Sequence, residues 1–195
     1  MPISPKSRAR KPRRREHLTA NEIEKLLAAA KSTRNPERDY AILLLMFRHG
    51  LRVSELCSIK LSDISLELRE LHVPRLKGSD SSTHPFHNGE TSAVTAWLAE
   101  RAKLSPSANC DTLFISELRK RLSRVTVWVM VREVARVAGL EHLAIHPHML
   151  RHSCGYSLVN RGIDIRSIQG YLGHRSITST TRYTALDSRR FAKFF

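Results

Sequence analysis

The chain has 195 residues, of which 41% are hydrophobic, so it can bury the core of one full domain and does not resemble a disordered tract. Lysine and arginine total 33 against 18 acidic residues, and the formal net charge of +15 favours a polyanionic partner, nucleic acid above all. Apolar runs are too short for a membrane span, we expect no secretory signal, and three scattered cysteines fit neither a disulfide framework nor a CxxC metal site.

Residues 1–17 are predicted to form a flexible basic arm. Its lysines and arginines are interrupted by prolines, and like charges together with prolines oppose a helix. We expect the run Arg13-Arg14-Arg15 to contact phosphates along DNA, with a solvated solubility tail as the alternative interpretation.

Helical signals begin directly after the arm. Thr19 and Glu22 have the spacing of a capping box, and Asn35 precedes a proline as the expected cap of a second helix. The segment 40–47 of that second helix is apolar all round, which predicts a central, buried position. Gly50 is expected to end it.

Arg52 and Glu55 follow this buried helix and lie three residues apart, so on a helix they share one face. Taken alone, the pair could be an ordinary surface ion pair. The alternating residues 70–75 predict a strand, which Pro74 would place at the edge of a sheet. A second short strand would return after a turn and leave Lys77 at the tip of a hairpin.

The second half of the chain predicts further helices. Ser123 is expected to cap a helix that ends at Gly139, although its valines also allow a strand. Helices are then predicted over residues 149–160, 164–172 and 178–184.

Three polar clusters occur between residues 146 and 184, and they are His148-Met149-Leu150-Arg151-His152, Leu172-Gly173-His174 and Thr181-Arg182-Tyr183-Thr184. Two histidines four residues apart have the spacing of zincins. The glutamate that zincins need is missing, and Arg151 would repel a dication, so we expect no metal site. The GxxxxGK[ST] and GxSxG motifs are also missing from the sequence.

The remaining interpretation is phosphodiester chemistry with a tyrosine nucleophile. An arginine fork can hold two phosphate oxygens and does not titrate near neutral pH. A tyrosine hydroxyl needs nearby positive charge or a base before it attacks, and the departing sugar hydroxyl needs a proton from a lysine or histidine. The polar clusters, with Arg52 and Lys77 added, contain each of these groups.

At these residues a resemblance becomes specific, and the motifs that carry it are residues 51–56 (LRVSEL), Lys77-Gly78, residues 148–152 (HMLRH), residues 172–174 (LGH) and Tyr183-Thr184. In this order they resemble the catalytic domain of the tyrosine recombinases, the phage-integrase family, over about residues 17–190. The sequence HPHMLRHSCG is most similar to that of the fimbrial phase-variation recombinases, which invert a promoter segment.

The resemblance implies a mainly α-helical fold with a small antiparallel β-sheet, the tyrosine recombinase catalytic-domain fold, over residues 18–195. Family members usually carry a separate N-terminal core-binding domain, and we expect none here, with the arm 1–17 before the catalytic domain. The family also implies DNA strand exchange without a nucleotide cofactor.

The resemblance also implies roles, carried over position by position. Arg52 and Arg151 would bind the scissile phosphate, and Glu55 would orient them. Lys77 would protonate the 5′-hydroxyl leaving group. The other members of the predicted site are His148 and His174, which would bind the phosphate or shuttle protons, and Tyr183, which would attack and form a 3′-phosphotyrosyl enzyme.

Other polar residues receive weaker predictions. Arg75 and Arg182 are expected among the DNA contacts. His152 is expected to pack along one helical face, and Tyr156 and Tyr171 are expected to pack in the core or at its rim.

We therefore expect a bacterial, nucleoid-associated cytoplasmic enzyme that inverts a regulatory DNA segment. Its expected partners are double-stranded DNA with inverted-repeat sites, a homotetramer in synapsis and DNA-bending accessory proteins. A non-catalytic DNA-binding regulator on the same fold, or a topoisomerase of the type IB kind, remains the alternative.

Overall fold

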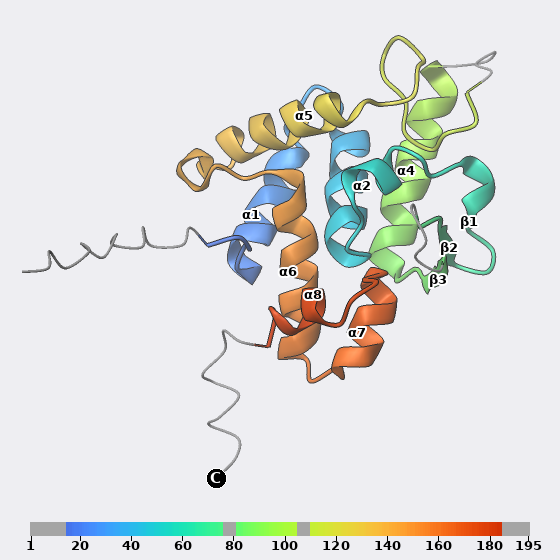
Figure 1. Ribbon diagram of the computed structural model, residues 1–195. Helices are drawn as coiled ribbons and strands as arrows, with labels where there is room; N and C mark the ends of the chain where they lie inside the picture. The colour runs from blue at the N-terminus through green and yellow to red at the C-terminus, as the bar shows by residue number, and fades with distance from the viewer. Residues whose placement is uncertain (1–14, 76–80, 105–109, 185–195) are drawn as a thin grey trace, which may run out of the picture.

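A computed structural model describes residues 15–75, 81–104 and 110–184. Within these ranges the protein is mainly helical with one small antiparallel sheet at its side (Figure 1), which confirms the predicted fold class. The elements in chain order are α1 (Ala20–Ala30), α2 (Pro36–Arg48), α3 (Val53–Leu56), η1 (Leu61–Asp63), β1 (Ile64–Ser65), β2 (Glu70–Val73), β3 (Ser82–Pro85), α4 (Asn88–Leu104), α5 (Arg124–Val137), η2 (Glu141–Leu143), α6 (Pro147–Asn160), α7 (Ile165–Leu172) and α8 (Thr178–Thr181). No helix in the described ranges is both long and apolar enough to cross a bilayer.

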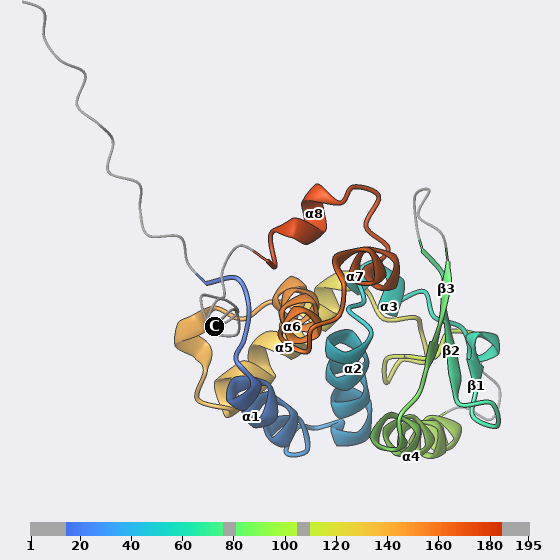
Figure 2. The same ribbon diagram turned by 90° about the horizontal axis from the view of Figure 1, so that it is seen from below.

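Helix α2 is the centre of the core, as its all-apolar segment predicts. Residues 41–46 are all buried, and α1, α4 and α6 pack around the helix. Figure 2 shows this arrangement from below, with α7 and α8 beyond α6 and the sheet beside α4. Because α2 is surrounded by helices, the residues that follow its C-terminal end are held by a rigid scaffold.

Most of the predicted helix ends are confirmed. The Thr19–Glu22 capping box begins α1, and the Ser123 side chain accepts a hydrogen bond from the backbone of Thr126 at the start of α5. Asn35 is the N-cap of α2 with Pro36 in the first turn, as predicted, although its side chain makes no cap hydrogen bond. Its Nδ2 instead donates to Glu117 Oε1 at 3.1 Å.

The sheet has the order β1-β2-β3, and both pairings are antiparallel. The prediction that Pro74 places its strand at an edge is wrong, because β2 lies between the other two strands. The ladder ends at Val73, so Pro74 follows the strand and interrupts no hydrogen bond. Strand β1 was not anticipated, since two residues are too short for an alternating pattern. The predicted hairpin residue Lys77 lies outside the described residues.

Candidate active site

The centre of the site is the carboxylate of Glu55, which is fully buried at the end of the short helix α3. Arg52 precedes that helix, and its Nη1 donates to Glu55 Oε1 at 2.5 Å while its backbone N–H donates to Oε2 at 2.8 Å. The predicted pairing of these two residues is therefore confirmed. The Arg52 side chain is 34% exposed, so the pair is anchored inside the protein and open to solvent at the guanidinium.

Two further guanidinium groups lie against the same carboxylate. Nη1 of Arg75 donates to Glu55 Oε2 at 2.8 Å, and Nη1 of Arg151 lies 3.8 Å from that oxygen. Three arginines and one glutamate leave two uncompensated positive charges at this point. Such an excess in a buried place favours an anion as the missing partner.

Arg151 is held by backbone carbonyls from two loops. Its Nη1 donates to Gly50 O and its Nη2 to Leu172 O, both at 2.5 Å. Burial and then the charge of Arg52 lower the pKa of Arg151 to about 10, which leaves it protonated at neutral pH. Arg151 therefore joins the end of α2 to the end of α7.

The prediction that Arg75 contacts DNA is corrected by its burial. The side chain is 0% exposed and bonds Glu55 and the carbonyl oxygen of Tyr171. Gly173 leaves room for it, because a Cβ there would lie 2.8 Å from Arg75 Nε, and its φ of 63° also favours glycine. Arg75 thus supports the site from behind and does not present its guanidinium to solvent.

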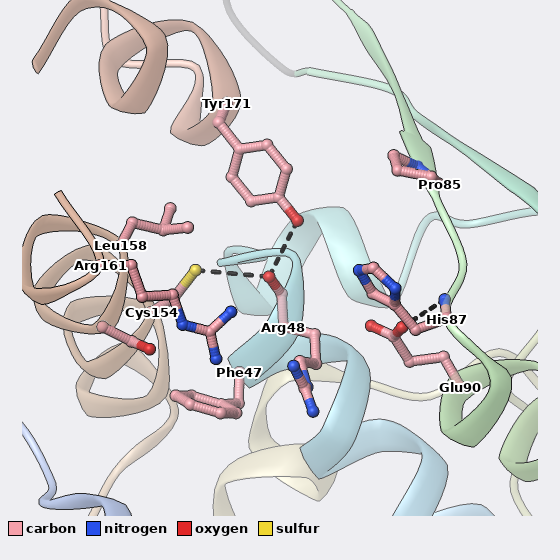
Figure 3. A pocket seen from close by; sticks show the side chains of 10 residues that line it. Phe47, Arg48, Pro85, His87, Glu90, Cys154, Leu158, Arg161 and Tyr171 are labelled. Carbon is pink, nitrogen blue, oxygen red and sulfur yellow. Dashed lines mark hydrogen bonds between the residues drawn. The ribbon is translucent and has the colours of Figure 1, made fainter. Parts of the chain in front are cut away.

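The scaffold behind the arginines is fixed by a small polar junction. Figure 3 shows Tyr171 from α7 and Cys154 from α6 converging on the carbonyl oxygen of Arg48 at the end of α2. The Tyr171 hydroxyl donates to it at 3.0 Å, and the Cys154 thiol at 3.4 Å. Helices α2, α6 and α7 therefore meet at Arg48, two residues before Gly50. Tyr171 was predicted only to pack, and this bond adds a polar role.

The two predicted site histidines both lie near Arg151, whose charge acts on each ring. His174 follows α7, and its Nδ1 lies 2.8 Å from Thr180 Oγ1. Burial, followed by the charges of Arg151 and Arg52, lowers the pKa of His174 to about 3, so its ring is neutral. His148 lies on the first turn of α6 with part of its surface open to solvent, and desolvation of the rest of its ring, followed by the charge of Arg151, lowers its pKa.

Tyr183 comes directly after the short helix α8 and is only 1% exposed. Its ring is stacked with that of His174 at a centroid distance of 6.1 Å, and its hydroxyl lies 3.1 Å from His152 Nδ1. Burial raises its pKa to about 12 against the opposing effect of Arg151. The structure therefore brings Tyr183 close to Arg151 and against His174.

A glycine makes this position of the tyrosine possible. A Cβ added at Gly155 would lie 2.6 Å from the Tyr183 ring, closer than atoms of real side chains approach. Tyr156, the next residue of α6, meets the same ring edge-to-face at 5.2 Å. The Tyr183 ring thus packs on the backbone of α6 at Gly155 and against the ring of Tyr156.

The predicted DNA-binding arginines are placed less completely. Arg13 and Arg14 lie outside the described residues. Arg15 is exposed and pairs with Glu22 at 2.5 Å, and Arg182 is exposed and pairs with Glu16 at 2.6 Å. In the described ranges, no group of three or more histidine, cysteine or carboxylate side chains is arranged to hold a metal ion.

Sequence reasoning missed three contributions to the site. Arg75 was expected among the DNA contacts, although its alternating strand already predicted that every second side chain would be buried. His152 was expected only to pack, yet it also bonds the Tyr183 hydroxyl. The need for glycine at position 155 depends on the approach of α8, which no local pattern reveals.

Taken together, the helical fold with its side sheet and the arginine–glutamate centre beside a tyrosine define the catalytic domain of a tyrosine recombinase. The model of the phage integrase family matches residues 16–190. The type 1 fimbriae regulatory protein FimB of Escherichia coli K12 is 45% identical over 179 residues, which cover 92% of this chain and 88% of FimB. FimE of the same strain is 41% identical, with 92% and 90% covered.

The solved structures give the same answer. The crystal structure of XerA recombinase superimposes with a TM-score of 0.81 and 32% identity, over 94% of this chain and 65% of that one. XerH site-specific recombinase bound to a palindromic difH substrate, in a post-cleavage complex, matches with a TM-score of 0.78 and 25% identity, over 91% and 52%. This chain belongs to the phage integrase family, and it is a site-specific tyrosine recombinase.

Proposed function

We propose that the enzyme cleaves one strand of duplex DNA by attack of Tyr183 on the scissile phosphate. This attack leaves a 3′-phosphotyrosyl enzyme and a free 5′-hydroxyl. A 5′-hydroxyl from a second duplex then attacks the phosphotyrosyl bond, which joins the new strand and releases Tyr183. Repeated on four strands, the exchange inverts the segment between two inverted sites. No nucleotide cofactor is needed, because the covalent bond conserves the energy of the phosphodiester.

The observation that carries this proposal is the uncompensated charge at Glu55. A phosphodiester under attack gathers negative charge on its non-bridging oxygens, and preorganised guanidinium groups stabilise that charge. The Arg52 side chain is 34% exposed there, and Arg151 is fixed by two carbonyls with Tyr183 close by. We infer that Arg52 and Arg151 bind the phosphate, and that Glu55 and Arg75 hold them in place.

The remaining roles follow from position. His174 is neutral and bonded to Thr180 through Nδ1, so its Nε2–H can donate to a phosphate oxygen. His148 lies exposed at the start of α6 and can do the same from the other side. We assign protonation of the leaving 5′-hydroxyl to Lys77, which follows β2 by four residues.

Duplex DNA is the proposed partner, with inverted-repeat sites, a homotetramer in synapsis and DNA-bending accessory proteins. XerH is bound to its difH substrate in the matched structure, and the net charge here is +15. Beside His148 an open groove is lined by Arg124 and Trp128 of α5. Trp128 is 48% exposed and carries Arg132 over its ring at 5.6 Å, a combination suited to phosphate and sugar contacts.

We infer inversion of a regulatory segment from the likeness to FimB and FimE, both named as regulatory proteins of type 1 fimbriae. That name also fits the alternative of a regulator that binds DNA without cleaving it. The two are separated with duplexes that carry inverted repeats, which are to be sought by sequencing the DNA that flanks the gene of this chain.

The decisive experiment uses a nicked suicide duplex, from which the cleaved fragment with the 5′-hydroxyl diffuses away. We expect the wild type to form a covalent protein–DNA adduct visible on a denaturing gel. Tyr183→Phe should form none while binding the duplex with unchanged affinity. Tyr156→Phe is the matched control, because that ring touches Tyr183 and its variant should retain the adduct.

If wild-type protein binds the duplex and forms no adduct, the catalytic proposal fails and the regulator remains. A topoisomerase of related chemistry would relax supercoiled plasmids that lack paired sites. We expect relaxation to require the inverted repeats.

Binding should depend steeply on salt, since phosphate contacts release condensed counterions. Each phosphate contact adds about 0.9 to the negative slope of log affinity against log salt. The Arg124→Ala variant should lower that slope by about one contact, measured by fluorescence anisotropy. A wild-type affinity that is flat with salt would contradict a basic DNA surface.

A further inference from the structure

Three side chains lie in a line from solvent to the nucleophile. The Tyr183 hydroxyl is 3.1 Å from Nδ1 of His152, and the other ring nitrogen, Nε2, is 3.9 Å from Oε2 of Glu16. Glu16 also accepts a hydrogen bond from Arg182, the residue before the nucleophile, at 2.6 Å. Carboxylate, imidazole and hydroxyl in this order are the arrangement by which a base activates a nucleophile.

We propose that His152 accepts the proton of Tyr183 during the attack on DNA, and that Glu16 is the positioning residue that orients its ring. This inference rests on the proposed function, since it adds a base to the same cleavage step. Proximity of Nδ1 to the attacking oxygen carries it.

The geometry favours the tautomer that the step needs. A carboxylate near Nε2 stabilises a proton on that nitrogen, which leaves the lone pair of Nδ1 for the tyrosine hydroxyl. His152 is 5% exposed on α6, so little water competes for this lone pair. Ser153 on the same helix accepts from the backbone N–H of Leu18 at 2.8 Å, which ties the segment carrying Glu16 to α6.

The other two site histidines are less suited to this role. Nδ1 of His174 is occupied by Thr180, and the ring of His174 stacks on Tyr183 with no bond to its hydroxyl. His148 is exposed and meets the edge of the His152 ring at a centroid distance of 4.4 Å. Among the described residues, His152 supplies the imidazole bonded to the nucleophile.

The step balances as follows. A lone pair of the Tyr183 oxygen forms the bond to phosphorus while the bond from phosphorus to the 5′-oxygen breaks. The phenolic proton moves to Nδ1 of His152, and the 5′-oxygen takes a proton from Lys77 in its assigned role. In the reverse step, the 5′-hydroxyl of the incoming strand attacks phosphorus, and the imidazolium returns its proton to the departing tyrosine oxygen.

In the DNA-free protein, burial and the surrounding charges make proton transfer from Tyr183 to His152 unfavourable. Burial, and then the charges of His148, Arg182 and Arg151, lower the pKa of His152 to about 3, while burial raises that of Tyr183 to about 12. Bound phosphate opposes those cations, and formation of the bond to phosphorus makes the phenol far more acidic. Transfer therefore accompanies bond formation and does not precede it, which keeps the nucleophile inert without DNA.

The first test compares single-turnover adduct formation on the suicide duplex by wild type and His152→Gln. Glutamine can hydrogen-bond the tyrosine but cannot take its proton. We expect a rate about 10²- to 10⁴-fold lower with DNA affinity within about twofold, the range for loss of a general base. His142→Gln is the control, since His142 is exposed on η2. An unchanged or faster rate for His152→Gln would overturn the inference.

The second test separates proton transfer from packing. His152→Ala should be rescued by free imidazoles, with a rate that rises with the pKa of the imidazole used. Fluorotyrosine at position 183 has a lower phenol pKa and needs less help from a base. The rate defect of His152→Gln should therefore be smaller in that background. A variant that folds and binds DNA but responds to neither change assigns His152 to packing alone.

Glu16→Gln should slow the same step less, about two- to tenfold, because the Glu16 carboxylate lies 3.9 Å from the ring of the base and is 60% exposed. A larger loss than for His152→Gln would contradict the order of roles. Wild-type protein that forms no adduct at all would sink the proposed function, whereas a wild-type adduct with a fully active His152→Gln sinks the inference alone.

Discussion

Two buried carboxylates near the C-terminal end of α2 have very different surroundings. Glu55 is fully buried and faces the guanidinium groups of Arg52, Arg75 and Arg151. All three arginines are charged at neutral pH, so the cluster has two positive charges in excess.

The second carboxylate is Glu90 at the start of α4, which is 2% exposed. Its Oε1 lies 3.3 Å from His49 Nε2, and its Oε2 accepts from the backbone N–H of His87 at 2.7 Å. His49 in turn lies 3.2 Å from His84, Nδ1 to Nδ1, and His84 is bonded to Ser82 at 2.8 Å. Burial first, then His49 and Arg75, lowers the pKa of His84 to about 3, so that ring is neutral.

The comparison shows that burial and bond number do not identify a site, whereas uncompensated charge does. The Glu90 cluster joins β3 to the ends of α2 and α4 through histidine rings, a serine and a backbone N–H, and His49 Nε2 has no hydrogen-bond partner there. The Glu55 cluster has two guanidinium charges in excess, and we propose that a phosphate completes it. The predictions below concern substitutions in one cluster or the other and the difference expected between their effects.

The largest effect is expected for Arg151→Ala. The variant loses a donor preorganised for the phosphate and leaves two carbonyls and part of Glu55 without their partner. Adduct formation should fall by about 10³-fold or more, measured on the suicide duplex. Arg136→Ala on α5, which breaks an exposed pair with Glu133, should stay within about twofold. Equal losses would contradict a special role for the Glu55 cluster.

A pair of matched variants compares the two carboxylates directly. Glu55→Gln removes the counter-charge of three guanidinium groups and should lower the free energy of unfolding by about 3–5 kcal/mol. Glu90→Gln keeps an acceptor for the His87 backbone and should cost about 1–3 kcal/mol.

Urea unfolding measures the stability of both variants, and repeating it with added sulfate tests separately whether either cluster binds an anion. Sulfate can occupy a cationic site in the folded state only, so it should stabilise Glu55→Gln more than Glu90→Gln. Equal responses to sulfate would show that neither cluster is an anion site.

The smallest effect concerns pH and the histidine cluster. The folded pKa of His84, about 3, is below its unfolded value, so the neutral ring stabilises the fold above pH 6.5 and this contribution is lost as pH falls toward 3. Wild-type stability should therefore fall more steeply than that of His84→Asn between about pH 5.5 and about pH 4, by about 1.4 kcal/mol per pH unit. Parallel pH curves from urea unfolding would show that His84 does not titrate as its burial requires.

The sequence alone determined the helices, because caps and apolar periodicity are local. Thr19 with Glu22, Ser123, and the glycines at 50 and 173 mark ends that the structure confirms. Residue types and their order in the motifs also identified the candidate catalytic groups, because they match the chemistry of phosphate and tyrosine.

Tertiary structure decided which of these groups act together. Arg75 belongs to Glu55 and not to the surface, since the position of a strand in its sheet is fixed by partners distant in sequence. His152 reaches the Tyr183 hydroxyl, and Gly155 admits the ring, only because α8 returns over α6. Periodicity reports which side of a helix is buried, but the neighbour that covers it, and hence a side chain's charge environment, comes from long-range packing.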